Sequence, residues 1–218
     1  MAKKKRIEAP KLGRVLDTLQ WDEYIAEERY LANGKMVEGE LSNISIEKMV
    51  IDGVVFSNVL FQKVLLHTCE LTDVVFNQCD LTNVDLADSI LHRVEFNECK
   101  LMGINLSGST LRNVKVAESV CDYAAFGFAN AKQVLFDHCS LQQTDFYECQ
   151  FKQVDFTECS LEGASFANTP MSGLDLSSCR FERMTVSLPL LEGCIVTSDQ
   201  AIGFAKVLGL RLKEDLPE

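Results

Sequence analysis

The sequence predicts an all-β fold, a four-sided β-helix that ends in a short C-terminal α-helix. The first observation behind this prediction is a five-residue period. Every position whose number ends in 1 or 6 is apolar from Ile46 to Leu191, and eleven of the thirteen phenylalanines stand at these central positions. A helix would need a period of 3.6 residues and a strand one of 2.0, so five fits neither. It fits a backbone that turns a corner after each short strand and buries one large side chain per side.

The second observation is a twenty-residue period, which sets the number of sides. Two positions before each central residue stands a smaller residue, and these residues repeat in columns of like type. One column is valine and another is cysteine interrupted by Ser119: Val54, Val74, Val94, Val114, Val134 and Val154, and Cys79, Cys99, Cys139, Cys159 and Cys179. Twenty residues are four pentapeptides, hence four sides. With ~4.8 Å between stacked strands, residues 41–190 should form about seven and a half coils, a rod of roughly 35 Å.

The third observation is that the register is unbroken from Ile46 to Leu191, so we expect no loop inserted into the coil. The weakest central positions are Cys121 and Ala131, because their side chains are small. We expect either that Tyr123 or Phe128 compensates for the missing volume, or that the coil bends there between two stacks.

The two ends differ from the body, because a solenoid needs caps over its terminal coils. We therefore divide the chain into a basic N-terminal arm and cap (1–40), the β-helix (41–190) and a C-terminal helix and dimerisation module (191–218). Residues 1–20 hold six basic and two acidic side chains and are expected to be a poorly ordered arm. Residues 21–40 should be irregular, with Trp21, Tyr24 and Tyr30 available to cover the first coil.

The C-terminal segment contains the signals of a helix. Pro189 interrupts the repeat, Thr197 and the residues after it supply an N-cap, and Gly209 suits the position after a helix that ends near Leu208. This helix has more apolar surface than its own coil would cover. We therefore predict a homodimer interface, formed by Ile202, Phe204, Val207, Leu208 and Leu210.

Nine cysteines and three histidines could in principle serve catalysis or metal binding. Eight of the cysteines stand two positions before a centre and Cys121 is central, so nearly all should face inward. Packing as small hydrophobic groups is the favoured interpretation, and a redox or metal role is the alternative. His67, His92 and His138 should project outward on three faces, in no ligand arrangement. A rod without loops offers no evident pocket, so we expect no enzyme, cofactor or metal.

The formal net charge of −11 is distributed unevenly over the sides of the coil. We name the sides, in order around the coil, the Phe56, Phe61, Leu66 and Leu71 faces, each after an early central residue. Over residues 41–190 the outward positions sum to −6, 0, −4 and +1 on these faces in that order. The two acidic faces are therefore opposite each other. We predict that the Phe56 face binds a partner through Glu95, Glu98, Glu118, Asp137, Asp155, Glu158 and Asp175, opposed by Lys115 alone.

An acidic body favours basic partners and repels phosphates, so we expect no direct nucleic-acid binding. The sequence carries no recognisable secretion signal or apolar run long enough for a membrane span, so we expect a cytoplasmic protein without membrane contact. A solvated surface that keeps the rod soluble is the plain interpretation of the charges. Two negative stripes on opposite sides of a straight rod, however, resemble the two phosphate backbones of a duplex.

The repeats resemble the pentapeptide-repeat family, whose motif is a small residue, Asp or Asn, Leu or Phe, and two variable residues. This resemblance covers about residues 41–190, with matches at Val84-Asp85-Leu86, Thr144-Asp145-Phe146, Val154-Asp155-Phe156 and Leu174-Asp175-Leu176. A narrower resemblance, to the Qnr quinolone-resistance proteins, lies in segments 123–126 and 129–130 and in the ending 191–193, 198–201 and 208–210.

The narrower resemblance implies a right-handed quadrilateral β-helix that dimerises through its C-terminal module. It also implies a rod that mimics DNA, binds DNA gyrase and topoisomerase IV, and protects them from quinolones or a gyrase poison. This chain lacks the projecting loops of the plasmid-borne Qnr proteins and so resembles the loopless chromosomal members. The alternative function is a structural scaffold or adaptor whose flat faces dock an unidentified protein.

Overall fold

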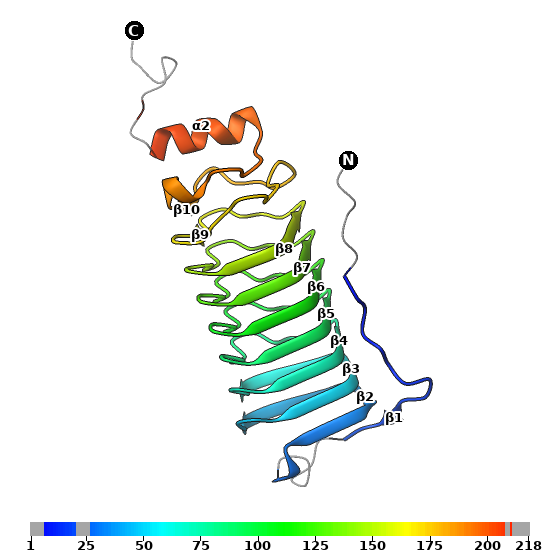
Figure 1. Ribbon diagram of the computed structural model, residues 1–218. Helices are drawn as coiled ribbons and strands as arrows, with labels where there is room; N and C mark the ends of the chain where they lie inside the picture. The colour runs from blue at the N-terminus through cyan, green and yellow to red at the C-terminus, as the bar shows by residue number, and fades with distance from the viewer. Residues whose placement is uncertain (1–6, 21–26, 208–209, 211–218) are drawn as a thin grey trace.

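The computed structural model describes residues 7–20, 27–207 and 210. Eight strands form one parallel sheet in chain order (Figure 1): β1 Asp17–Thr18, β2 Tyr30–Ser45, β3 Val50–Leu65, β4 Glu70–Asn77, β5 Ile90–Asn97, β6 Thr110–Ala117, β7 Asn130–Asp137 and β8 Gln150–Thr157. A second sheet pairs β9 Ser165–Phe166 with β10 Thr185–Val186. A short 3₁₀ helix, η1 Leu188–Leu190, and the helix α2 Ser198–Val207 follow.

From β2 onward every strand pairing joins residues twenty apart, which confirms the predicted four-sided β-helix. Val74, Val94 and Val114 are successive partners on one side of the coil. Isolated bridges such as Asp80↔Lys100 and Asp85↔Asn105 connect the remaining sides with the same offset. The coil is longer than the sequence predicted. It begins within β2, where Leu31 and Met36 are buried, and its last bridge joins Asp175 to Ile195.

The repeat therefore occupies residues 30–195, and residues 30–40 are regular rather than irregular. Residues 30–36 were hidden from the sequence argument because Gly34 stands two positions before Met36, where the same column elsewhere has valine. At twenty residues per coil this is about eight coils, a rod of roughly 40 Å.

The buried central residues form columns in which rings stack on rings. Phe56, Phe76 and Phe96 are parallel neighbours, with ring centroids 5.1 and 4.9 Å apart. Higher in the rod, Phe136 and Phe156 stack at 5.1 Å in the same column. Such stacking makes the interior of the rod nearly continuous aromatic packing along this side, and offset-stacked pairs are among the favoured geometries.

The coil around Cys121 and Ala131 is neither filled by Tyr123 or Phe128 nor visibly bent. Tyr123 and Phe128 are 65% and 59% exposed, so their side chains lie outside the core. The compensating residue is Phe126, a central residue that meets Phe136 edge-on at 5.7 Å and stacks on Phe146 at 5.1 Å. Strands β5 to β8 keep their register through this coil, and the stack continues straight in Figure 1.

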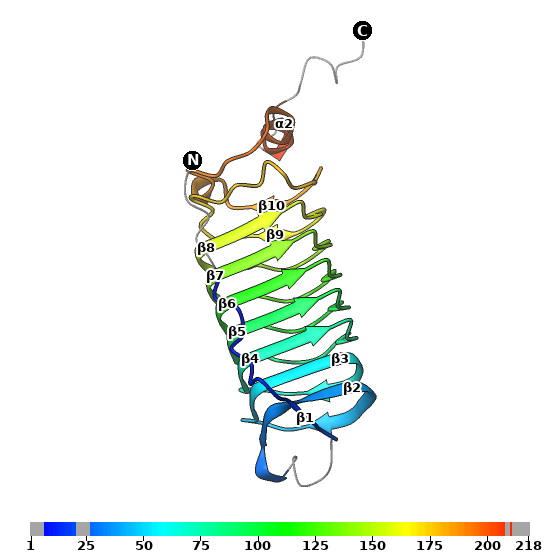
Figure 2. The same ribbon diagram turned by 90° about the vertical axis from the view of Figure 1, so that its right-hand side faces the viewer.

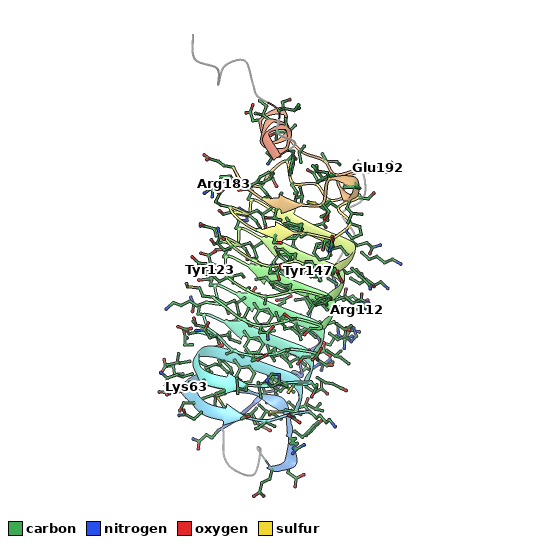
Figure 3. The ribbon with its side chains drawn as sticks, turned by 90° about the vertical axis from the view of Figure 1, so that its left-hand side faces the viewer. Lys63, Arg112, Tyr123, Tyr147, Arg183 and Glu192 are labelled. Carbon is green, nitrogen blue, oxygen red and sulfur yellow. The ribbon has the colours of Figure 1, made fainter. Side chains whose placement is uncertain are left out.

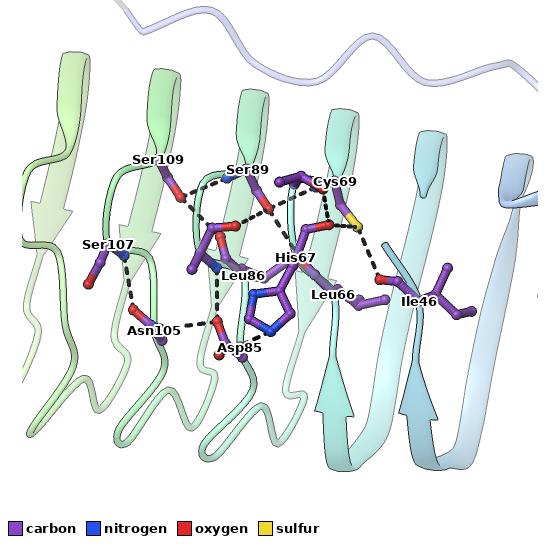
Figure 4. A network of polar contacts seen from close by, with 12 residues as sticks. Ile46, Leu66, His67, Cys69, Asp85, Leu86, Ser89, Asn105, Ser107 and Ser109 are labelled. Atoms are coloured by element: carbon purple, nitrogen blue, oxygen red, sulfur yellow. Dashed lines mark hydrogen bonds and ion pairs between the residues drawn. The ribbon is translucent and has the colours of Figure 1, made fainter. Parts of the chain in front are cut away.

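The positions two before each centre form inward columns of hydrogen bonds (Figure 4). Ser89 Oγ accepts a bond from Cys69 N at 3.0 Å, and Ser109 Oγ accepts one from Ser89 N at 3.1 Å. The thiol of Cys149 donates to Phe126 O at 3.0 Å. These side chains satisfy the backbone of adjacent coils, so Cys, Ser and Thr alternate in the columns without leaving a buried polar atom unpaired among the described residues.

The cysteines face inward as predicted. Eight of the nine are buried, and all nine are free thiols. Burial raises the pKa of Cys69 and raises that of Cys149 to about 12, so neither thiol ionises near neutral pH. Packing and backbone hydrogen bonding account for these residues, and no reactive thiolate is needed to explain them.

The corners of the coil use a left-handed backbone conformation. In the part of the chain that the structure describes, twenty-five residues other than glycine have φ between 50° and 62°, and apart from Arg29 their numbers all end in 3 or 8. This conformation crowds Cβ against the following carbonyl and is most easily adopted by Gly, Asn and Asp. Most corners are accordingly polar, and Tyr123 and Phe128 are the two corners with a tyrosine or phenylalanine.

The N-terminal arm does not match the poorly ordered segment that we predicted. From Ile7 to Gln20 the chain runs along one corner of the rod, in the opposite direction to the coil (Figures 1 and 2). Glu8 N donates to Asn113 Oδ1 at 3.1 Å, and Lys11 N donates to Asp73 Oδ1 at 2.7 Å. The arm then enters the sheet as β1, beside residues 34 and 35 of β2.

The arm also supplies the described part of the N-terminal cap. Leu19 packs against the core, and a Cβ on Gly34 would collide with its side chain, so glycine is required there. Tyr30 is 53% exposed and therefore does not cover the first coil. Trp21 and Tyr24 lie outside the described residues.

The C-terminal helix begins with the predicted cap. Thr197 Oγ1 accepts from Gln200 N at 3.2 Å, and Gln200 Oε1 accepts from Thr197 N at 2.8 Å, a reciprocal capping box. The amide nitrogen Nε2 of Gln200 donates to Leu176 O and Cys179 O, both at 2.9 Å. Phe204 stands 5.8 Å from Phe181, centroid to centroid. The cap thus fixes α2 across the end of the rod.

Candidate partner-binding surface

The Phe56 face carries the acidic residues that the sequence selected, and the structure places them outward. Glu98, Glu118, Asp155, Glu158 and Asp175 are exposed, and Glu95 and Asp137 are half-buried. The face is flat because β4 to β8 cross it in register, each strand one coil beyond the last. A partner would therefore meet a straight ribbon of carboxylates rather than a cleft.

The acids do not form one continuous line, because they occupy three different outward columns. Glu95 is followed one coil later by Lys115 and then by Leu135 and Asp155. Glu98 and Glu118 occupy adjacent coils of a corner column in which His138 comes next. The negative field is therefore densest where these columns lie side by side, from Glu118 to Glu158.

His138 is a member of this surface that the sequence analysis did not pair with any acid. Its Nδ1 lies 3.0 Å from Asp137 Oδ1 and its Nε2 lies 3.1 Å from Glu158 Oε2. The hydrogen bond to Asp137, and next the charge of Glu158, raise the pKa of His138 above its usual 6.5. The signal in the sequence was the twenty-residue spacing, which puts His138 directly between Glu118 and Glu158.

The Phe61 face has as many charges but pairs them across coils. Lys100 Nζ lies 3.5 Å from Asp80 Oδ2, and Arg183 Nε lies 3.3 Å from Glu162 Oε1. Both pairs join residues about one coil apart. Half of the charges on this face are therefore neutralised locally by ion pairs.

On the Leu71 face, Arg93 has a structural role that sequence reasoning missed. Its guanidinium binds Asp73 in a bidentate pair of 2.6 and 2.7 Å, with both side chains at most 13% exposed. Burial raises the pKa of Asp73, but the hydrogen bonds from Arg93 and Lys11 N and the positive charge of Arg93 outweigh it and leave that pKa lowered. This pair anchors the arm.

The residues predicted to form a dimer interface lie on or just after α2, at the end of the rod (Figure 1). Ile202 is 42% exposed and Leu210 58% exposed, while Phe204 is half-buried against Phe181. Val207 belongs to α2, and Leu208 lies outside the described residues. Phe204 therefore serves the cap, and the exposed apolar area comes from Ile202 and Leu210.

Among residues 7–20, 27–207 and 210, no group of three His, Cys, Asp or Glu side chains could hold a metal ion. The helical part of the described chain contains no segment long and apolar enough to cross a membrane. An open hollow of about 710 Å³ beside His138 is lined by Ser140, Glu158 and Arg180 among others.

Comparison with known proteins defines the class. The family model described as "Pentapeptide repeat region" matches three overlapping stretches, residues 51–126, 89–166 and 129–195. This chain therefore belongs to the pentapeptide-repeat family. The uncharacterized protein YisX of Bacillus subtilis (strain 168) is 36% identical over 203 residues, which cover 93% of this chain and 96% of YisX.

Solved structures with similar folds are more distant. A trypsin-treated form of QnrB1, a plasmid-mediated fluoroquinolone resistance protein, is 17% identical over 90% of this chain and 95% of its own, with a TM-score of 0.44. HetL, from Nostoc sp. strain PCC 7120, is 16% identical over 81% and 90%, with a TM-score of 0.30. Scores this low add nothing to the functional argument.

Proposed function

We propose that this protein is a non-catalytic mimic of DNA that binds type II topoisomerases, gyrase and topoisomerase IV, through its Phe56 face and protects them from quinolones or a gyrase poison. The observation that carries the proposal is the flat acidic ribbon on a straight rod. The resemblance of segments 123–130 and 191–210 to Qnr proteins supports it and supplies the partner.

The mechanism is electrostatic complementarity between the ribbon and the DNA-binding surface of the enzyme. The backbone ladder holds adjacent coils in fixed positions, so binding requires little ordering of the rod and little of the interaction energy is lost. A rod of roughly 40 Å matches about twelve base pairs at a rise of about 3.4 Å. The direct contact would be with protein, because phosphates would be repelled by the same charges.

The test replaces four acids on the dense part of the ribbon by their amides: Glu118, Asp137, Asp155 and Glu158. One exposed charge contributes only ~0–1 kcal/mol, so several must be removed together. We expect the dissociation constant for gyrase to rise about tenfold or more at low salt, and its salt dependence to weaken. Titration of labelled protein with gyrase at two salt concentrations measures both quantities, and circular dichroism confirms folding.

The matched control removes four acids from the neutral Phe61 face, by replacing Asp80, Asp122, Glu162 and Glu182 with their amides. This variant has the same net charge as the first but an intact ribbon. We expect its affinity to fall much less. Equal weakening of both variants would show that net charge alone attracts the enzyme. Arg93 is kept out of any control because it anchors the arm through Asp73.

We further propose that two copies join end to end through α2 and Leu210, which doubles the length of the ribbon. The exposed side chains of Ile202 and Leu210 support this arrangement. Replacing both by Ser keeps the capping box and the Phe204 contact intact. Sedimentation of this variant should give monomers. A dimer of unchanged strength would place the interface elsewhere.

The alternative function, a scaffold whose flat faces dock another protein, is favoured by a different observation. The exposed apolar residues Leu60, Leu65 and Ile90 stand on the three faces other than the Phe56 face. Binding assays with gyrase distinguish the two functions directly. If the wild-type protein neither binds gyrase nor inhibits its supercoiling in competition with DNA, the scaffold takes precedence.

A further inference from the structure

The middle of the rod displays two aromatic side chains where the fold least tolerates them. Tyr123 and Phe128 are successive corners of one coil, and both have φ of 62°. Bulky side chains are unfavourable in this conformation, and these two are 65% and 59% exposed, so neither is compensated by burial in the core. Backbone strain that the core does not use is a recognised mark of a functional position.

The surface between the two corners is smooth and bordered by acids. Ala125 and Gly127 are the outward residues between them, on the Leu66 face. The Asp145 carboxylate reaches over this strip, since its Oδ2 would lie 3.5 Å from a Cβ placed on Gly127. Glu148 is exposed one coil beyond Phe128.

A third ring extends the aromatic surface to the next coil. Tyr147 meets Phe128 edge-on, with centroids 5.4 Å apart. Its hydroxyl accepts a hydrogen bond from Asn168 Nδ2 at 3.2 Å, and a hydrogen bond to the neighbouring Glu148 raises its pKa. Figure 3 shows Tyr147 near the middle of this side of the rod and Tyr123 at its edge.

We propose that Tyr123, Phe128 and Tyr147, together with Asp145 and Glu148, form a docking patch for an arginine side chain of a protein partner. Ring faces attract a cation, and arginine in particular stacks on aromatic rings while its guanidinium pairs with carboxylates. Tyrosine anchors of this kind dominate interface energetics when neighbouring contacts exclude water. The acids exclude a nucleic-acid ligand, because they would repel its phosphates.

The patch adds a contact to the proposed function, and the identity of the partner rests on that function. The arginine-binding chemistry of the patch does not depend on it. It lies on the Leu66 face, opposite the Phe56 face. A partner that contacts both faces must therefore surround the rod on two opposite sides, as a concave DNA-binding surface surrounds a duplex. The acidic ribbon would supply attraction over a distance, and the aromatic patch would fix the position of the rod along its own axis.

The first experiment tests the chemistry without gyrase. The full-length protein is labelled with 3-fluorotyrosine, and its ¹⁹F spectrum is followed during titration with the peptide acetyl-Gly-Arg-Gly-Arg-Gly-amide. We expect the Tyr123 and Tyr147 signals to move and that of Tyr30, exposed at the far end of the rod, to stay. A peptide with citrulline in place of arginine is the uncharged control and should have little effect. Equal movement of Tyr30, or an equal effect of citrulline, would overturn the proposal.

The second experiment compares the effect of two corner substitutions on gyrase affinity with their effect on the melting temperature. Asn tolerates the left-handed corner, so Tyr123→Asn and Phe128→Asn should leave the melting temperature unchanged or raise it. The double variant should nevertheless bind gyrase about tenfold more weakly, with an unchanged salt slope. Wild-type affinity in the double variant, while the acid-to-amide variant fails, would refute the patch and leave the proposed function standing.

Two further results complete the design. If wild-type protein does not bind gyrase at all, the proposed function fails and the peptide titration alone decides the patch. If the double variant instead loses self-association in sedimentation, the patch is a contact between copies of this chain and the arginine proposal is wrong.

Discussion

The Phe56 and Phe61 faces are neighbours on the same coil, yet the first is strongly acidic and the second is neutral. On the Phe61 face, Lys100 and Arg183 lie within 3.5 Å of acids about one coil away and cancel them locally. On the Phe56 face, the coils from Glu95 to Asp175 have one lysine among their acids, Lys115, besides the titratable His138. Both faces have the same backbone. The difference shows that in a stacked coil the charge of a face depends on which residues recur every twenty positions.

Breaking the shared core has the largest expected effect, because both faces depend on it. Phe136→Ala removes a ring that stacks on Phe156 and meets Phe126 and Phe146. We expect a loss of ~3–5 kcal/mol in the free energy of unfolding. Phe136→Leu, which keeps most of the volume, should cost clearly less. Urea denaturation measures both, and equal stability of wild type and Phe136→Ala would show that this column is not the core.

Breaking the arm anchor should have the next largest effect. Asp73→Asn leaves the charge of Arg93 unpaired and nearly buried, which should cost about 2–3 kcal/mol. Because the folded-state pKa of Asp73 is lowered, its contribution is present above the unfolded pKa and is lost as pH falls through the folded value. The difference in melting temperature between wild type and Asp73→Asn should therefore shrink in acid. A constant difference down to about pH 2 would contradict this account.

Removing the positive charge of Lys115 should increase the difference in charge between the Phe56 and Phe61 faces. Lys115→Gln leaves the Phe56 ribbon without a lysine between Glu95 and Asp175, and gyrase affinity should rise about two- to threefold. Lys100→Gln changes net charge equally on the Phe61 face and should have a smaller effect. Titrations of the two single variants side by side make the comparison. A larger gain from Lys100→Gln would invert our assignment of the binding face.

The smallest expected effect comes from His138. Protonation places a positive charge between Asp137 and Glu158, so affinity for a basic partner should fall as pH drops through the raised pKa of His138. The effect of His138 on folding stability has the opposite pH dependence. The contacts that stabilise protonated His138 in the folded protein are lost as pH rises through its raised pKa. In His138→Asn, the roughly twofold change in affinity between about pH 6 and about pH 8 should disappear. An identical pH profile would exclude His138 as its source.

Sequence periodicity was sufficient for the fold because each repeat contacts mainly its neighbours, so local pattern and global structure coincide. The columns, the corners and the capping box of α2 all follow from spacing. The arm could not be predicted in this way. Its anchors, Asn113 and Asp73, look like ordinary corner residues, and they hold the arm through its backbone amides, which no side-chain pattern in residues 7–20 reveals.

For the same reason, the sequence predicted the outward direction of side chains in the candidate site but not their pairing. Outward direction follows from register, so the acids of the Phe56 face were found. Pairing depends on side-chain reach, and the contacts of His138 and Arg93 were therefore missed. The role of Tyr123 was misassigned because volume alone suggested the core, whereas its corner position directs the side chain to solvent.

The arm has a consequence for biosynthesis. Glu8 is bound by a residue made 105 positions later, so this contact of the arm can form only after Asn113 has left the ribosome. At roughly 5–20 residues per second, this interval is about 5–20 s. During that time the arm can already be held nearer its other end, where β1 pairs with β2 and Lys11 N donates to Asp73 Oδ1. Completion of the coil that contains Asn113 then fastens Glu8, so the arm is secured from β1 backward to Glu8.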